Sequence, residues 1–188
     1  VYFGGNAEDV AGNIDGFAAT FPEHSLYLVN YRGFGGSSGR PTESGLAADA
    51  LAVYEQARTE HPDIAVMGRS LGSAVAISLA SRRPVSKLVL VTAYDSLVDV
   101  AKAHIRWLPV GLLLRDRYDS ASLAPKVTSP VLAVIAGQDE IIPRARSEAL
   151  VAAFPPGTVQ VKVVPGTMHN TLDLSPEYLG SVAAFLRE

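Results

Sequence analysis

Gly68-Arg69-Ser70-Leu71-Gly72 separates an apolar run, Ile64–Met67, from a run of small and apolar residues, Ser73–Ala80. A G-x-S-x-G pattern between a strand and a helix is typical of a sharp turn that lifts a serine hydroxyl above a sheet. Residues around that serine have to be small, because the turn strains its backbone and the helix starts close to the strand. The stretch predicts a strand–turn–helix unit with a nucleophilic Ser70.

The same pattern occurs a second time, at Gly35-Gly36-Ser37-Ser38-Gly39. Arg40-Pro41-Thr42 follows this copy directly, and proline there prevents a helix from starting in the same way. We therefore expect a glycine-serine loop around Ser37 rather than a second nucleophile.

Short apolar runs alternate with helical stretches along the chain, which is typical of an α/β protein with a largely parallel sheet. Runs rich in Val, Ile and Leu are expected as strands covered by helices on both faces: Val1–Phe3, Leu26–Asn30, Ile64–Met67, Leu88–Thr92, Val131–Ala136 and Val159–Val164. The expected helices are Val10–Thr20, Ser44–Glu60 (capped by Ser44), Leu71–Ser81, Arg144–Ala153 and Pro176–Arg187. We predict a single domain over residues 1–188.

Residues of about 94–130 form a long excursion between two expected strands, with an apolar segment at residues 104–114 that includes Trp107. The excursion is too short for a separate domain and long enough for a small helical lid. The apolar segment either forms a wall over the active site or packs on the sheet.

Composition narrows the class of protein. At 188 residues, with 48% hydrophobic and 19% charged residues, the chain fits one globular domain. A net charge of −3 gives no indication of a basic binding face, so we expect no nucleic-acid partner. Cysteine is absent, which excludes disulfides and thiolate metal sites and is typical of a cytoplasmic protein. No membrane-spanning run or signal peptide is visible, although a start at Val1 leaves an anchor upstream open.

A serine hydroxyl is a weak nucleophile and needs a base. In hydrolases with this turn, the acid and the histidine follow the serine along the chain. His169 lies in a loop after the last expected strand, where α/β sheets assemble their sites. The other histidines precede Ser70 or fall in the excursion: His24, His61 and His104. We therefore predict His169 as the base.

The acid is expected in the loop after Val131–Ala136. Asp139 there could accept the imidazole N–H, fix its tautomer and stabilise the imidazolium. Two alternatives stay open: Glu140, which is adjacent, and Asp95, which follows the preceding strand. Asp139 could also be an aspartate that only caps a turn.

Acyl transfer also needs donors for an oxyanion. The backbone N–H of Leu71 is one candidate, because it follows the nucleophile at a helix N-terminus. The N–H of Asn6 is the other, since Gly4-Gly5 lets that backbone approach a substrate. The segment Gly4–Ala7 could alternatively be a plain strand-to-helix turn.

Together these segments resemble the α/β-hydrolase superfamily over the whole chain, in particular small single-domain members labelled serine aminopeptidase-like hydrolases, with a minimal lid. The resemblance rests on Phe3–Ala7, Asn30–Ser37, Gly68–Ser73, Gly137–Pro143 and Met168–Asn170. It implies Ser70 as nucleophile, Asp139 as acid, His169 as base, and Asn6 and Leu71 as the oxyanion hole. It also implies that Asn30–Ser37 is a structural loop.

The chain departs from that family in two places. Relatives usually carry His-Gly before the oxyanion residue, where this chain has Gly4-Gly5, and the missing histidine normally supports the loop. The family's sheet usually has about eight strands, and this chain opens at the third. We therefore expect an α/β-hydrolase fold that lacks the first two strands.

We expect a serine hydrolase that cleaves a small, hydrophobic carboxylic ester through an acyl-enzyme, without a metal or an organic cofactor. Peptide or thioester cleavage by the same three residues stays open. A non-catalytic binding protein with the hydrolase fold is the alternative from another class.

Overall fold

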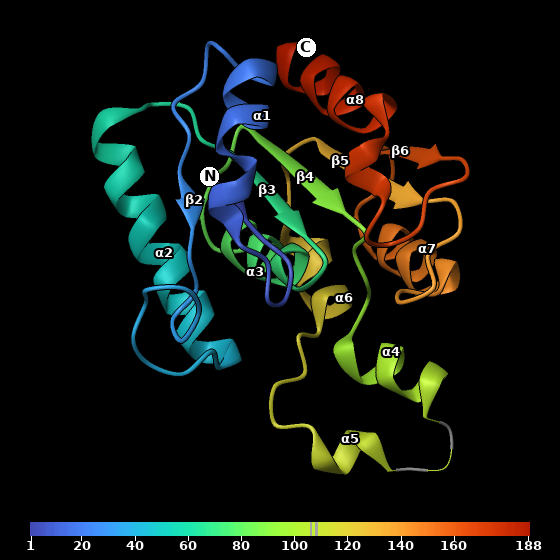
Figure 1. Cartoon of the computed structure of the whole chain (residues 1–188). Coiled ribbons are helices and arrows are strands. Elements are labelled where there is room, and N and C mark those ends of the chain that lie inside the picture. Colours follow the sequence, from blue (N-terminus) through green and yellow to red (C-terminus); the bar gives the residue numbers. More distant parts are fainter. Residues whose placement is uncertain (106, 108) are drawn as a thin grey trace.

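The structure of the chain, a computed structural model, describes residues 1–105, 107 and 109–188. The described residues form a six-stranded sheet in the order β2-β1-β3-β4-β5-β6, and every neighbouring pair is parallel (Figure 1). The strands are β1 (Tyr2–Phe3), β2 (Leu28–Val29), β3 (Ala65–Arg69), β4 (Lys87–Val91), β5 (Val131–Ala136) and β6 (Val159–Val164). The predicted α/β class with a parallel sheet is confirmed.

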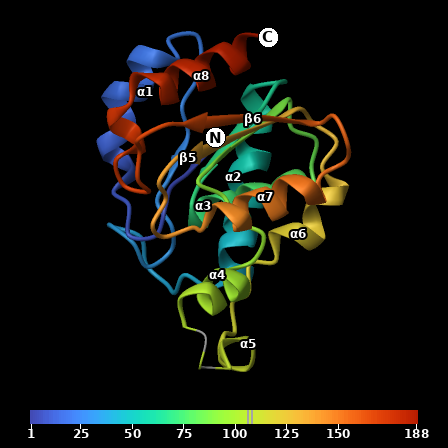
Figure 2. The same cartoon turned by 90° about the vertical axis from the view of Figure 1, so that its right-hand side faces the viewer.

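Helices cover both faces of this sheet (Figure 2). One face carries α2 (Glu43–Glu60), α3 (Leu71–Ala80) and α7 (Arg144–Ala153), and the other carries α1 (Ile14–Thr20) and α8 (Pro176–Arg187). Strand β4 shows why both layers are needed: Leu88 and Leu90 pack in the first core, whereas Val89 and Val91 pack in the second. A strand that buries both faces reads as a continuous apolar run, which is how the sequence indicated it.

Some element bounds differ from the prediction. Strand β2 has two residues instead of the expected 26–30, as suits a short edge strand of a sheet. Helix α2 begins at Glu43, because the side chain of Thr42, not Ser44, caps it by accepting the N–H of Gly45 at 3.2 Å. The expected helix over 10–20 divides into a 3-10 turn, Val10–Asn13, followed by α1.

The excursion between β4 and β5 contains α4 (Leu97–His104), α5 (Val110–Leu113), α6 (Ser120–Leu123) and a 3-10 turn, Ala124–Lys126. Helix α6 packs against α3, while α4 and α5 extend away from the carboxyl ends of the strands (Figure 1). Val110 is buried, whereas Trp107 and Leu112 are 84% and 87% exposed. Arg106 and Leu108 of the predicted lid lie outside the described residues.

In the described part of the chain, no helix combines the length and the hydropathy needed to cross a membrane.

Candidate active site

Ser70 lies at the junction of β3 and α3, as the G-x-S-x-G pattern predicted. Its backbone has φ 49° and ψ −115°, a left-handed conformation that is strained for a residue with a side chain. The flanking glycines allow this turn to pack. A Cβ at Gly68 would lie 2.2 Å from the carbonyl oxygen of Gly72, and a Cβ at Gly72 would lie 2.0 Å from that of Phe3. The turn therefore requires glycine at both positions.

The structure brings Ser70, His169 and Asp139 together, although they lie far apart in the sequence. The Oγ of Ser70 is 3.1 Å from Nε2 of His169, and Nδ1 of His169 is 2.9 and 3.0 Å from the two carboxylate oxygens of Asp139. The side chains of His169 and Asp139 are only 6% and 3% exposed. This geometry assigns the Nδ1 proton to the carboxylate contact and leaves Nε2 free to accept the serine proton.

Asp139 is held rigidly in the loop after β5. Its Oδ1 accepts the backbone N–H groups of Ile141 at 3.0 Å and Ile142 at 2.7 Å. The same carboxylate thus organises a turn and contacts the imidazole, so the two interpretations of Asp139 from the sequence are compatible. A carboxylate fixed by its own loop can orient the ring without moving during a reaction.

The alternative acids occupy other positions. Glu140 accepts the backbone N–H of His169 at 3.0 Å and holds the histidine loop rather than the ring. Asp95 is 7% exposed and accepts a hydrogen bond from Nη1 of Arg146 at 3.0 Å. Burial raises the pKa of the Asp95 carboxyl, while the N–H of Ser96 and the Arg146 guanidinium act in the opposite direction.

The predicted oxyanion loop lies next to the nucleophile. A Cβ built on Gly5 would lie 3.8 Å from Cβ of Ser70, which places the loop after β1 against the turn. Among the described residues, the N–H groups of Asn6 and Leu71 have no hydrogen-bond partner. Leu71 is the first residue of α3, where the N–H groups point out of the helix. The N–H of Leu71 therefore directly follows Ser70, and Asn6 follows the glycine that approaches the Ser70 side chain.

Two charged residues beside the site were missed by sequence reasoning. Glu8 accepts the N–H of Gly5 at 2.6 Å, and Arg69 donates to the carbonyl oxygen of His169 at 3.1 Å. The sequence does place Arg69 next to Ser70, because Arg69 occupies the first variable position of the G-x-S-x-G pattern. A charge in a loop is usually solvated, so the sequence alone gave no reason to connect the two.

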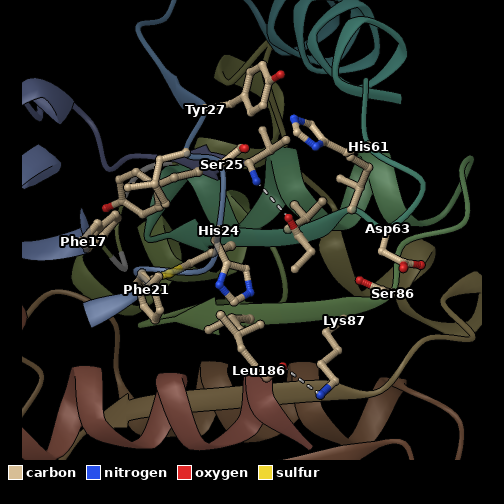
Figure 3. A pocket seen from close by; sticks show the side chains of 18 of the residues that line it. Phe17, Phe21, His24, Ser25, Tyr27, His61, Asp63, Ser86, Lys87 and Leu186 are labelled. Atoms are coloured by element: carbon tan, nitrogen blue, oxygen red, sulfur yellow. Dashed lines mark hydrogen bonds between the residues drawn. The ribbon is translucent and has the colours of Figure 1, made fainter. Parts of the chain in front are cut away.

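A cavity of about 430 Å³ lies at the opposite end of the sheet, at the amino ends of β1 to β4. Figure 3 shows its lining, which includes Phe17, Phe21, His24, His61 and Lys87 and none of the three residues joined at Ser70. Among the described residues, no group of three or more His, Asp or Glu side chains is arranged to hold a metal ion. The candidate active site is therefore the group of Ser70, His169 and Asp139 at the carboxyl ends of the strands, where α/β sheets place their sites.

The sequence is similar to those of bacterial and mammalian proteins. An uncharacterized protein of Mycobacterium tuberculosis is 44% identical over 170 residues, which cover 87% of this chain and 60% of that protein. Human alpha/beta hydrolase domain-containing protein 17C is 30% identical over 166 residues, which cover 86% of this chain and 49% of that protein. The chain therefore spans 60% or less of the length of these relatives.

Solved structures show the same fold. A monoacylglycerol lipase of Paleococcus ferrophilus matches with a TM-score of 0.75 at 17% identity, covering 98% of this chain and 92% of that one. A lipase-esterase related protein of Clostridium acetobutylicum matches with a TM-score of 0.73 at 16% identity, covering 99% and 91%. A sequence model of the family described as alpha/beta hydrolase fold matches residues 3–124, well over half of the chain. The chain belongs to the alpha/beta hydrolase fold family.

Proposed function

We propose that this protein is a serine hydrolase that cleaves carboxylic esters through an acyl-enzyme on Ser70. The observation that carries the proposal is the continuous chain of hydrogen bonds from Ser70 Oγ through the His169 ring to the Asp139 carboxylate. A nucleophile, a base and a group that orients the base, each within hydrogen-bond reach of the next, make up the minimum apparatus for acyl transfer.

The reaction follows from the positions of the atoms. His169 Nε2 takes the proton of Ser70 as Oγ attacks the ester carbonyl carbon, and Asp139 stabilises the resulting imidazolium. The N–H groups of Asn6 and Leu71 are assigned to the oxyanion of the tetrahedral intermediate. His169 then gives the proton to the leaving alkoxide as the C–O bond breaks. In the second half, His169 activates water, which attacks the acyl-enzyme and releases the carboxylic acid and Ser70.

A hydrophobic substrate is supported by the residues around the site. Met168 directly precedes His169 and is 43% exposed, and Ile141, two residues after Asp139, is 40% exposed. Large exposed apolar side chains beside a reactive group are suited to an acyl chain or an apolar alcohol.

Helix α4 contacts the loop that carries Asp139, because His104 Nε2 lies 2.8 Å from the carbonyl oxygen of Ile141. Because of this contact, we assign residues of about 94–130 the role of a lid.

Aminopeptidase activity is less well supported than ester cleavage, because the two candidate carboxylates, Asp95 and Glu140, are not suited to bind an amine. Such an enzyme needs a carboxylate that is shielded from solvent and free to pair with the substrate's ammonium group. Asp95 is buried but already paired with Arg146. Glu140 is exposed, and its Oε2 accepts the N–H of His169. Ester cleavage is therefore favoured within the small serine aminopeptidase-like hydrolases that the sequence resembles.

A panel of chromogenic substrates tests this preference. We expect p-nitrophenyl esters to be hydrolysed with a kcat/KM at least about 100-fold above that of aminoacyl p-nitroanilides, since Asp95 and Glu140 are both already engaged by other groups. Lengthening the acyl chain from acetyl to butanoyl should raise kcat/KM, with a ceiling of about 4-fold per methylene. Faster cleavage of the anilides would assign the protein to the peptidases, and a flat response to chain length would contradict the apolar acyl site.

A further inference from the structure

Glu8 is a largely buried carboxylate in the loop that follows β1, with its side chain 14% exposed. It accepts the N–H of Gly5 at 2.6 Å on one oxygen, and the hydroxyl of Tyr2 at 2.7 Å and the amide of Asn13 at 2.8 Å on the other. Burial raises the pKa of the Tyr2 hydroxyl above its usual value, so this group remains a donor. Three donors converge on one carboxylate, so Glu8 fixes the loop from within.

The turn that Glu8 closes contains the candidate oxyanion donor. The N–H of Glu8 donates back to the carbonyl oxygen of Gly5 at 3.3 Å, so the two residues clamp Asn6 between them. Ala7, next in the turn, has a φ of 59°, which is uncommon for a residue with a side chain and needs support from its surroundings. The direction of the Asn6 N–H therefore depends on the contact between Glu8 and Gly5.

Arg69 joins this loop to the histidine loop. Its Nη1 is 3.9 Å from Oε2 of Glu8, and its Nη2 donates to the carbonyl oxygen of His169 at 3.1 Å and to Asp173 at 3.5 Å. The Arg69 side chain is 15% exposed, so its ion pair with Glu8 is only weakly screened by water. Arg69 thus contacts both Glu8 of the oxyanion loop and the backbone of His169, the proposed base.

The neighbouring glycine shows that Glu8 fills space that another side chain would need. A Cβ on Gly4 would lie 2.6 Å from Cγ1 of Val10 and 3.2 Å from the carboxyl carbon of Glu8. Position 4 is where this chain departs from the family that it resembles, whose members usually carry a histidine there that supports the loop. In this chain the supporting group comes from Glu8 instead.

We propose that Glu8 is a positioning residue that orients the N–H of Asn6, the proposed oxyanion donor. We also propose that Arg69 links the position of Glu8 to that of the histidine loop. The inference rests on the proposed function. Neither residue touches the reacting atoms, so their effect is on the rate of the chemical step rather than on substrate binding. A shift of about 1 Å in a donor is enough to lower a rate by about 100-fold.

Glu8→Gln tests this role with little change in shape. The amide has one acceptor oxygen where the carboxylate has two, so it cannot satisfy all three donors, and it no longer attracts Arg69. With a p-nitrophenyl ester, we expect kcat to fall by about 10- to 100-fold. KM should stay within about 3-fold of wild type, because ground-state binding is not altered. Labelling by a fluorophosphonate should slow in parallel, since its P=O group uses the same donors.

The matched control is Glu55→Gln. Glu55 also pairs with an arginine, Arg83, at 2.6 Å, but both side chains are substantially exposed and lie outside the site. We expect wild-type kcat and KM from this variant. If Glu8→Gln does not fold, Arg69→Gln breaks the other end of the pair and should lower kcat in the same way. If both fold, the effects of the two substitutions should be less than additive, because each of them removes the shared Glu8–Arg69 ion pair.

Folded Glu8→Gln and Arg69→Gln proteins with wild-type kcat, or with a raised KM alone, would overturn the positioning role. In that case the wild-type protein still turns over the ester, and the proposed function stands. A wild-type protein that neither hydrolyses esters nor reacts with fluorophosphonate would overturn the proposed function itself, and the positioning role with it.

Discussion

Replacement of Ser70 by alanine is expected to abolish ester hydrolysis, with kcat falling by on the order of 10⁴-fold or more. The physical reason is that the acyl-enzyme cannot form without Oγ, which is the atom that His169 faces at 3.1 Å. Steady-state rates on a p-nitrophenyl ester, at protein concentrations high enough to detect residual turnover, measure the effect. The thermal midpoint reports in parallel that the variant is folded.

The control for this substitution is present in the same chain. Ser37 occupies the equivalent letter in the second G-x-S-x-G copy, and the structure places it in a loop where its hydroxyl donates to the carbonyl oxygen of Asn30 at 3.4 Å. Ser37→Ala should retain wild-type kcat. If Ser70→Ala retained substantial turnover, or if only Ser37→Ala lost it, the nucleophile would not be the serine of the β3–α3 turn.

Gly72→Ala is expected to destabilise the protein by roughly 3 kcal/mol or more, or to prevent folding. The added Cβ would lie 2.0 Å from the carbonyl oxygen of Phe3 and 2.6 Å from that of Gly4. Both contacts are backbone atoms, and Phe3 belongs to β1, which is paired on both sides, so neither can move aside without displacing α3 from the sheet. Urea unfolding followed by far-ultraviolet circular dichroism measures the change in the free energy of unfolding.

Gly180→Ala is the control for Gly72→Ala, and we expect this glycine-to-alanine substitution to stabilise the protein instead. Gly180 lies inside α8, is exposed, and has nothing within 4 Å of its Cβ position. Alanine is a better helix former than glycine by about 1 kcal/mol, so this variant should be more stable than wild type. A Gly72→Ala protein as stable as wild type would show that α3 does not approach β1 as closely as the structure places it.

The parts of the molecule that were predictable are those with a strong local signal. Leu88–Val91 of β4 and all of β5 are apolar and buried because both faces of the sheet are covered there, and that composition identified them without a structure. The position of Ser70 at a strand–helix turn was predictable because Gly68 and Gly72 form a local pattern around it, although the contact that requires Gly72 comes from the distant Phe3. The positions of His169 and Asp139 followed from their place after strands of a parallel sheet.

The parts that were not predictable depend on contacts between distant segments. Nothing local connects Glu8 to Arg69, because their pairing exists only once β1 and β3 lie side by side in the sheet. The cap of α2 was misplaced by two residues because Thr42 and Ser44 are both suitable N-cap types. The two-residue length of β2 reflects its position at the edge of the sheet rather than its composition.

The central claim is that Ser70 is an activated nucleophile, and covalent labelling tests it most directly. Wild-type protein would be treated with a fluorophosphonate and digested, and the modified residue would be identified by mass spectrometry. We expect one adduct per chain on Ser70, formed more slowly when His169 is replaced by alanine and absent in Ser70→Ala. An adduct on another serine, or no adduct on folded wild-type protein, would contradict the claim.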